Sequence, residues 1–196
     1  MNRTIDYYNQ NAAAFAAGTL HADMSECRKR FLKYVKPGGI ILDAGCGSCR
    51  DALSFLQEGY GVEAFDASEE LCRIAGELLG FPVKCLRFEE LSGTALYDGI
   101  WACASLLHVQ PEDLEDVIRR LKELLKPDGV LYASWKEGST DREKGGRFFH
   151  DMTPEDCRIL FQTAGFEVLE VFQTTDVRPG RESEGWVNII GKKITH

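Results

Sequence analysis

Several features that would restrict the class of this protein are scarce in its 196 residues. No apolar run approaches the roughly 18 residues of a membrane span, because Ser105 and His108 interrupt the longest one. The first residues lack the apolar core of a signal peptide. Basic residues are also in deficit, with 23 Lys and Arg against 31 Asp and Glu and a formal net charge of -8. We therefore expect a cytoplasmic protein that binds neither a membrane nor, as its main partner, a nucleic acid.

A disulfide framework is also absent, because the seven cysteines are odd in number and follow no paired spacing. Cys46 and Cys49 form one C-x-x-C motif, but no second motif or histidine cluster completes a four-ligand metal site. We expect reduced cysteines and no metal, with these two as small residues that fill a loop.

Apolar periodicity predicts strands that alternate with helices. The predicted strands are 40–43, 62–66, 83–88, 97–103, 130–135, 166–172 and 186–192. The predicted helices are 6–17, 25–35, 49–57, 69–79, 111–126 and 154–164. Strands joined through helices run parallel, whereas the last two have no helix between them. The fold class expected is α/β: a three-layer sandwich whose mostly parallel seven-stranded sheet has an antiparallel C-terminal edge strand and helices on both faces.

The length suits one domain, expected over residues 1–196. Within it we expect an N-terminal helical lid (1–36), a cofactor-binding core (37–135) and a region of substrate loops and last strands (136–196). The segment 138–151 is expected to be one of these loops, with Gly145 and Gly146 as hinges.

The segment IILDAGCGS (40–48) predicts a buried strand that ends at Asp43 and turns sharply into a helix. Gly45 and Gly47 permit positive φ and a close approach of a ligand to the backbone. The free amides of the turn favour a polar or anionic group. A dinucleotide-binding loop would have a third glycine where Arg50 stands, which disfavours a nicotinamide cofactor. Asp66, at the tip of the next strand, can hold ribose hydroxyls for either kind of cofactor.

Four short motifs occur along the chain in an order that is typical of one protein family. They are LDAGCGS (42–48), FDAS (65–68), LLHV (106–109) and LLKPDGV (124–130). Together they resemble the class I (Rossmann-like) S-adenosylmethionine-dependent methyltransferases, over about 7–192. The stretch 46–51 is similar to small-molecule and tellurite-type members. The resemblance implies S-adenosyl-L-methionine as the cofactor and methyl transfer to a small-molecule acceptor as the activity.

The resemblance also implies which residues contact the cofactor. They are Asp43, Gly45, Cys46, Gly47, Asp66, Ala67, Phe88, Glu89 and Ala104. Asp43 would lie near the ammonium group and Asp66 would hold the ribose. Many members have Asp where Phe88 stands, so Glu89 is the alternative partner for the adenine amine. Asp43 as a strand-end cap, Asp66 as a turn residue and Phe88 as a core residue are the structural alternatives.

His108 is the candidate catalytic base, which is needed only if the acceptor carries a proton. Its alternative role is packing against the loop. The expected substrate-binding residues lie on three segments that can cover the site: Tyr8, Arg147, Phe149, Arg178, Arg181 and Trp186. The arginines suit a bidentate contact with an anionic group, although solvated arginines are also common on loops.

Three other functions remain open. They are an RNA- or tRNA-directed methyltransferase, a nicotinamide-dependent oxidoreductase and a non-catalytic cofactor-binding module. The motifs specify neither the atom of the acceptor that is methylated nor the oligomeric state.

Overall fold

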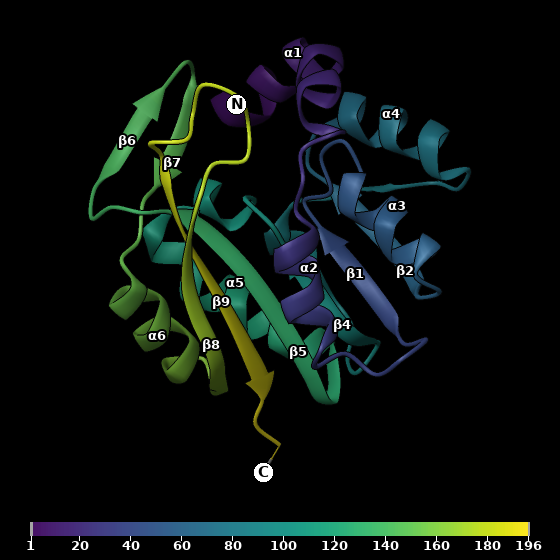
Figure 1. Ribbon diagram of the computed structural model, residues 1–196, viewed down its shortest axis with the longest axis vertical. Helices are drawn as coiled ribbons and strands as arrows, with labels where there is room; N and C mark the ends of the chain where they lie inside the picture. The colour runs from purple at the N-terminus through teal and green to yellow at the C-terminus, as the bar shows by residue number, and fades with distance from the viewer. Residues whose placement is uncertain (1, 196) are drawn as a thin grey trace.

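A computed structural model describes residues 2–195. Its centre is a seven-stranded sheet with the order β3-β2-β1-β4-β5-β9-β8 (Figure 1). The strands are β1 (Ile40–Ala44), β2 (Gly61–Asp66), β3 (Lys84–Cys85), β4 (Tyr97–Ala102), β5 (Leu125–Lys136), β8 (Phe166–Thr175) and β9 (Gly185–Lys193). The strands β3, β2, β1, β4 and β5 are parallel, which confirms the predicted fold class.

Helices cover both faces of the sheet. They are α1 (Arg3–Thr19), α2 (Ser25–Leu32), α3 (Arg50–Gln57), α4 (Glu69–Leu79), α5 (Pro111–Leu124) and α6 (Pro154–Thr163), with short 3-10 turns η1 (Phe88–Glu90) and η2 (Leu106–His108). Phe31 of α2 and Phe55 of α3 pack on one face with Trp101 and Tyr132, whose rings stack at 3.8 Å. The apolar sides of α5 and α6 pack on the other face. Within residues 2–195, no helix has both the length and the apolar composition needed to cross a membrane.

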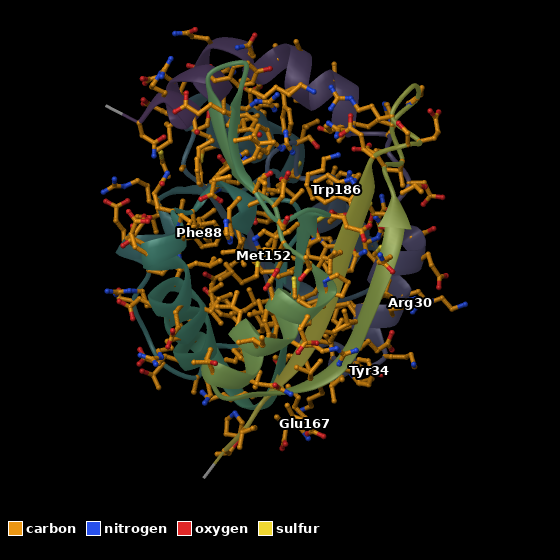
Figure 2. The ribbon with its side chains drawn as sticks, turned by 90° about the vertical axis from the view of Figure 1, so that its left-hand side faces the viewer. Arg30, Tyr34, Phe88, Met152, Glu167 and Trp186 are labelled. Carbon is orange, nitrogen blue, oxygen red and sulfur yellow. The ribbon has the colours of Figure 1, made fainter. Side chains whose placement is uncertain are left out.

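The C-terminal strand β9 is antiparallel to both of its neighbours, β5 and β8. It lies between them, so the edge of the sheet is β8 and not the C-terminal strand itself. The burial of the two strands agrees with this order of strands. Residues 187–191 of β9 are all buried, as in an interior strand, whereas β8 is partly exposed along most of its length. Arg30 and Tyr34 lie beside β8 (Figure 2) and contact Glu170 on it.

The segment 138–151 was predicted as a loop, and this prediction is wrong. It contains a hairpin of β6 (Asp141–Lys144) and β7 (Arg147–His150). Gly145 and Gly146 form its two-residue turn with φ values of 59° and 79°. Positive φ at both positions is the geometry of a type I′ turn, which matches the twist of a hairpin.

The predicted strand 83–88 is also shorter in the structure. Only Lys84–Cys85 pair with β2. The side chain of Glu90 accepts a hydrogen bond from the Arg87 amide at 2.8 Å, and this contact starts the turn η1 instead of extending the strand. Phe88 therefore lies in η1.

Candidate active site

A cavity of about 690 Å³ opens at the carboxyl ends of β1, β2, β4 and β5. Open α/β sheets bind ligands at this end, and the volume is typical of pockets for small ligands. Helix α1 lies across this end of the sheet, with the β6–β7 hairpin beside it (Figure 1). Every site residue predicted above lines the cavity. Residues of α1 and of the β6–β7 hairpin are among the lining residues.

The glycine loop after β1 has the predicted conformation. Gly45 has φ 75° and Gly47 has φ 52°. A Cβ atom on Gly45 would lie 2.5 Å from Cβ of Ser105, which is closer than real side chains approach. The hydroxyl of Ser105 donates to the Ala44 carbonyl at 2.7 Å. The loops that follow β1 and β4 are therefore locked together, and glycine is required at position 45.

Asp43 connects this loop to the helix that follows it. Its Oδ2 atom accepts from the Ala52 amide, in the first turn of α3, at 3.1 Å. Such amides have no partner within the helix, so a buried carboxylate satisfies one of them. Burial, followed by the negative charge of Asp51, raises the pKa of Asp43 well above its usual range. The strand-end role of Asp43 is thus present, and its contact with a cofactor ammonium group stays a prediction.

Asp66 bridges two loops at the end of β2. Its two carboxylate oxygens accept from the Gly47 amide and the Ser68 amide, each at 2.9 Å. Burial raises the pKa of Asp66, and these amide hydrogen bonds oppose the rise. A carboxylate has about four acceptor positions, so two amides leave capacity for hydroxyl donors.

Arg50 occupies the position where a dinucleotide-binding loop would have glycine. Its guanidinium pairs with Asp51, with Nη2 2.6 Å from Oδ2. Asp51 is buried and also accepts from Arg28 and from the Trp101 indole. Burial opposes ionisation, but the two guanidinium groups hold the pKa of Asp51 below its usual value. This buried cluster anchors α3 beneath the cavity, and sequence patterns did not predict it.

The segment after β4 is strained where it faces the cavity. Ala104 has φ 52°, which is uncommon for a residue with a Cβ atom. Its amide donates to the hydroxyl of Ser134 at 2.9 Å. Strain of this kind persists where neighbouring contacts hold it, often at functional sites. Ser134 is a site residue that the sequence analysis missed, because it lies in the middle of an apolar strand.

The residues predicted for the adenine side come from the ends of β2 and β3. Ala67 and Phe88 are partly buried, whereas Glu89 is exposed. The ring of Phe88, labelled in Figure 2, packs edge-on against Phe65 at 5.2 Å between centroids. Cys46 is buried, and burial raises the pKa of its thiol well above the usual value. It is therefore a protonated, unreactive group at this wall.

His108 is held on both ring nitrogens. Its Nδ1 atom lies 2.6 Å from the Phe148 carbonyl, and its Nε2 atom lies 2.9 Å from the Tyr8 hydroxyl. Burial lowers the pKa of His108 to about 4. The hydrogen bond to the Phe148 carbonyl raises the pKa, but its effect is smaller than that of burial. The ring is thus neutral near pH 7. A carbonyl only accepts, so Nδ1 carries the proton and Nε2 accepts from Tyr8.

Helix α1 is held over the cavity by contacts on two sides. On the side of β2, the Ser68 hydroxyl lies 2.7 Å from Oδ1 of Asn9 and donates to it. On the side of the hairpin, the Phe148 amide donates to the Thr4 hydroxyl at 3.1 Å. Asn9 and Thr4 are contacts that sequence reasoning missed, because their partners are distant in the sequence.

The predicted arginines differ in their surroundings. Arg178 makes two hydrogen bonds to Asp176, at 2.8 Å from Nε and 2.5 Å from Nη2. Asp176 also accepts from the buried ammonium of Lys136 at 2.9 Å and from the Trp186 indole at 3.1 Å. Arg178 and its neighbours Lys136 and Trp186 thus form a charged wall around Asp176. Trp186 is the second residue of β9, at this end of the sheet (Figure 2).

Arg181 is exposed, 4.0 Å from Glu184. Arg147 extends from β7 among aromatic rings, and its guanidinium lies 5.1 Å from the centre of Phe149. Phe149 is buried. Within residues 2–195, the seven cysteines are all free, and no three His, Cys, Asp or Glu side chains are grouped as metal ligands.

Residues 41–129 match the protein family described as a methyltransferase domain. A malonyl-[acyl-carrier protein] O-methyltransferase of Erwinia pyrifoliae is 32% identical over 148 residues, which cover 67% of this chain and 54% of that protein. A ribosomal protein L11 methyltransferase of Aquifex aeolicus is 26% identical over 184 residues, which cover 92% of this chain and 62% of that protein. The chain thus spans little more than half the length of these curated relatives.

A solved structure has the same fold. It is the Burkholderia thailandensis 1,6-didemethyltoxoflavin-N1-methyltransferase, which contains 1,6-didemethyltoxoflavin and S-adenosylhomocysteine. Its TM-score is 0.79 at 21% identity, and the match covers 97% of this chain and 85% of that chain. The predicted closeness to tellurite-type members is not confirmed by these relatives. The four motifs, the matched domain and the fold agree, and the chain belongs to the class I S-adenosylmethionine-dependent methyltransferases.

Proposed function

We propose that the protein transfers a methyl group from S-adenosyl-L-methionine to a small-molecule acceptor. The observation that carries this proposal is the convergence of Gly45, Gly47, Asp66 and Ala104 on one cavity at the carboxyl end of the sheet. Each has a feature suited to a ligand: two glycines with positive φ, a carboxylate with acceptor capacity left over, and a strained backbone.

The residues present fit this cofactor. The glycine loop offers close backbone approach for the methionine part, where Asp43 and Cys46 form the floor. Asp66 would hold the ribose hydroxyls through its remaining acceptor positions. Ala67, Phe88 and Glu89 would border the adenine, with Glu89 as the polar partner of the adenine amine.

The cofactor supplies a methyl group activated on a sulfonium, so the protein chiefly aligns the acceptor and excludes water. Helix α1 and the β6–β7 hairpin perform the second task by covering the cavity. Tyr8, Phe149, Arg178, Arg181 and Trp186 are proposed to line the acceptor side. Where the acceptor carries a proton, Nε2 of His108 would receive it through the Tyr8 hydroxyl.

We propose that three segments of the chain form different parts of this cavity. Residues 1–36 contribute the lid, 37–135 the cofactor-binding core, and 136–196 the hairpin and the charged wall of the acceptor side. Two of the matched relatives are named for a malonyl-[acyl-carrier protein] and for ribosomal protein L11. The enclosure of the cavity by α1 and the hairpin favours a small acceptor over a protein or an RNA, and the net charge of -8 further disfavours RNA.

Calorimetric titration with S-adenosylhomocysteine and, separately, with NADH tests the cofactor. We expect binding of the first alone, and a preference for NADH would overturn the proposal. A mass-spectrometric search for methylated products, in a metabolite extract with labelled S-adenosylmethionine, tests turnover. Labelling of bulk tRNA or protein instead of a small molecule would contradict the acceptor class.

A further inference from the structure

Arg147 differs from the other charged residues of the cavity. Within residues 2–195, Arg147 and Lys144 are the lysine or arginine side chains lining the cavity with no carboxylate within 4.0 Å. Lys144 is exposed next to the hairpin turn, whereas Arg147 is partly buried. In a chain with an excess of acidic residues, an enclosed arginine without an acidic partner is unusual.

The carboxylates near Arg147 on the hairpin have other partners. Glu143 pairs with Arg3 at 3.3 Å, and Asp141 pairs with His150 at 2.5 Å. Asp151 accepts two hydrogen bonds from Arg142. No described acidic side chain is therefore left to neutralise Arg147 from within the hairpin.

Aromatic rings surround the guanidinium instead. Its central carbon lies 4.4 Å from the centroid of Tyr7, 5.1 Å from that of Phe149 and 5.8 Å from that of Tyr8. Aromatic faces attract a cation but accept few of its N–H hydrogen bonds. The Nε atom of Arg147 is buried and has no hydrogen-bond partner, which is a costly arrangement for a polar group.

A planar guanidinium that packs against aromatic rings can still donate to a bidentate partner through its two Nη groups. Arg147 lines the same cavity as Tyr8 and His108, whose side chains are hydrogen-bonded to each other. From this arrangement we infer that Arg147 is the binding site for an oxyanion on the acceptor, either a carboxylate or a phosphate. The inference rests on the proposed function and defines its substrate class: a small anionic acceptor.

Titration with simple aromatic probes tests this site. Benzoate, phenyl phosphate and benzamide are titrated into the full chain, with and without saturating S-adenosylhomocysteine. We expect benzoate or phenyl phosphate to bind about tenfold or more tightly than the neutral benzamide. The tighter of the two anions identifies the acceptor group as a carboxylate or a phosphate. Equal affinity for benzamide, or no binding of either anion, would overturn the inference.

Variants locate the effect. Arg147→Gln should abolish the preference for the anion, and Arg147→Lys should weaken it, because an ammonium lacks the planar fork. The control Lys144→Gln removes the same charge from the same hairpin and should keep the preference. An unchanged preference in Arg147→Gln would refute the site. Circular dichroism and S-adenosylhomocysteine affinity report whether each variant folds. If the wild type does not bind S-adenosylhomocysteine, the proposed function is refuted. The titration of the anions without S-adenosylhomocysteine still tests the role of Arg147, because it does not depend on cofactor binding.

Discussion

The hydroxyl of Tyr8 lies 2.9 Å from Nε2 of His108, so a residue of the first helix occupies the basic nitrogen of the predicted catalytic histidine. The Phe148 carbonyl fixes the other nitrogen as the proton carrier. In the proposed mechanism, a proton that leaves the acceptor would reach His108 by way of Tyr8. The predicted base is thus one half of a pair whose other half comes from α1.

Replacement of either partner tests this pair. We expect His108→Ala and Tyr8→Phe to lower kcat by about a hundredfold each, in the range of general-base effects. Affinity for S-adenosylhomocysteine should change less than about twofold, because neither side chain belongs to the glycine loop. Turnover measured with the acceptor found by screening decides the matter. Wild-type kcat in both variants would assign the pair a packing role.

The depressed pKa of His108 makes a contribution to stability that depends on pH. The unfolded chain takes up this proton near pH 6.5, whereas the folded protein resists it until about pH 4. The contribution of the neutral ring is therefore complete above pH 6.5 and is lost as the pH falls. Between pH 7 and pH 5, the free energy of unfolding should drop by about 2 kcal/mol more in the wild type than in His108→Asn. Urea titrations at several pH values measure this difference, and parallel curves would contradict it.

A comparison of Gly45→Ala with Gly59→Ala distinguishes the cost of steric contact from the cost of backbone strain. Both have positive φ, 75° and 88°, but a Cβ at Gly59 would meet no atom within 4 Å. We expect Gly59→Ala to cost about 1–2 kcal/mol of stability from backbone strain alone. Gly45→Ala should cost about 1–3 kcal/mol more, because Ser105 must move, and it should abolish cofactor binding. Thermal unfolding and calorimetry measure both effects, and equal behaviour of the two variants would show that the close approach is unimportant.

Asp66 and Asp98 are carboxylates that both accept a backbone amide, but at opposite ends of the sheet. Asp98 is the second residue of β4, where it accepts from the Ile40 amide at 2.8 Å and from Lys126 at 2.7 Å. Asp66→Asn should weaken S-adenosylhomocysteine binding by about tenfold or more, because it removes a charged acceptor for hydroxyl groups. Asp98→Asn should reduce stability and leave the affinity within about twofold. A matching loss of affinity in both variants would mean that Asp66 acts only through folding.

The wall around Asp176 predicts a large effect on stability. The carboxylate is buried between Lys136 and Arg178, and those contacts hold the pKa of Asp176 well below its usual range despite its burial. Asp176→Asn leaves Lys136 with a weakened partner, so we expect a loss of about 3 kcal/mol. Glu184→Gln, which alters a more exposed partner of Lys136, should cost about 1 kcal/mol or less. Chemical unfolding measures the loss of stability in the two variants. A larger loss in Glu184→Gln than in Asp176→Asn would contradict this prediction.

Most of the fold follows from local pattern. In α5, Leu114, Val117, Ile118 and Leu121 recur at helical spacing, and all four are buried. The β6–β7 hairpin escaped prediction because β6 is charged and exposed, so it has no apolar alternation. Its signal was nevertheless present, since Gly145-Gly146 between two short segments is a typical hairpin turn.

The site divides in a similar way. The glycine loop and Asp66 could be predicted because their roles depend on neighbours close in the sequence. The pairing of Arg178 with Asp176, two residues away, was within reach of the same reasoning. The contact of Tyr8 with His108 was not, because 100 residues separate them. That Arg147 has no acidic partner is a property of three dimensions, and no sequence pattern records it.

Helix α1 touches both halves of the cavity, through Asn9 at Ser68 and through Thr4 at Phe148. Under the proposed function, one helix therefore borders the sites of two different ligands. A ligand that holds this helix down on one side also prepares the other side, without any contact between the two ligands. We therefore expect cofactor and acceptor to increase each other's affinity, and by thermodynamic linkage the two factors are equal.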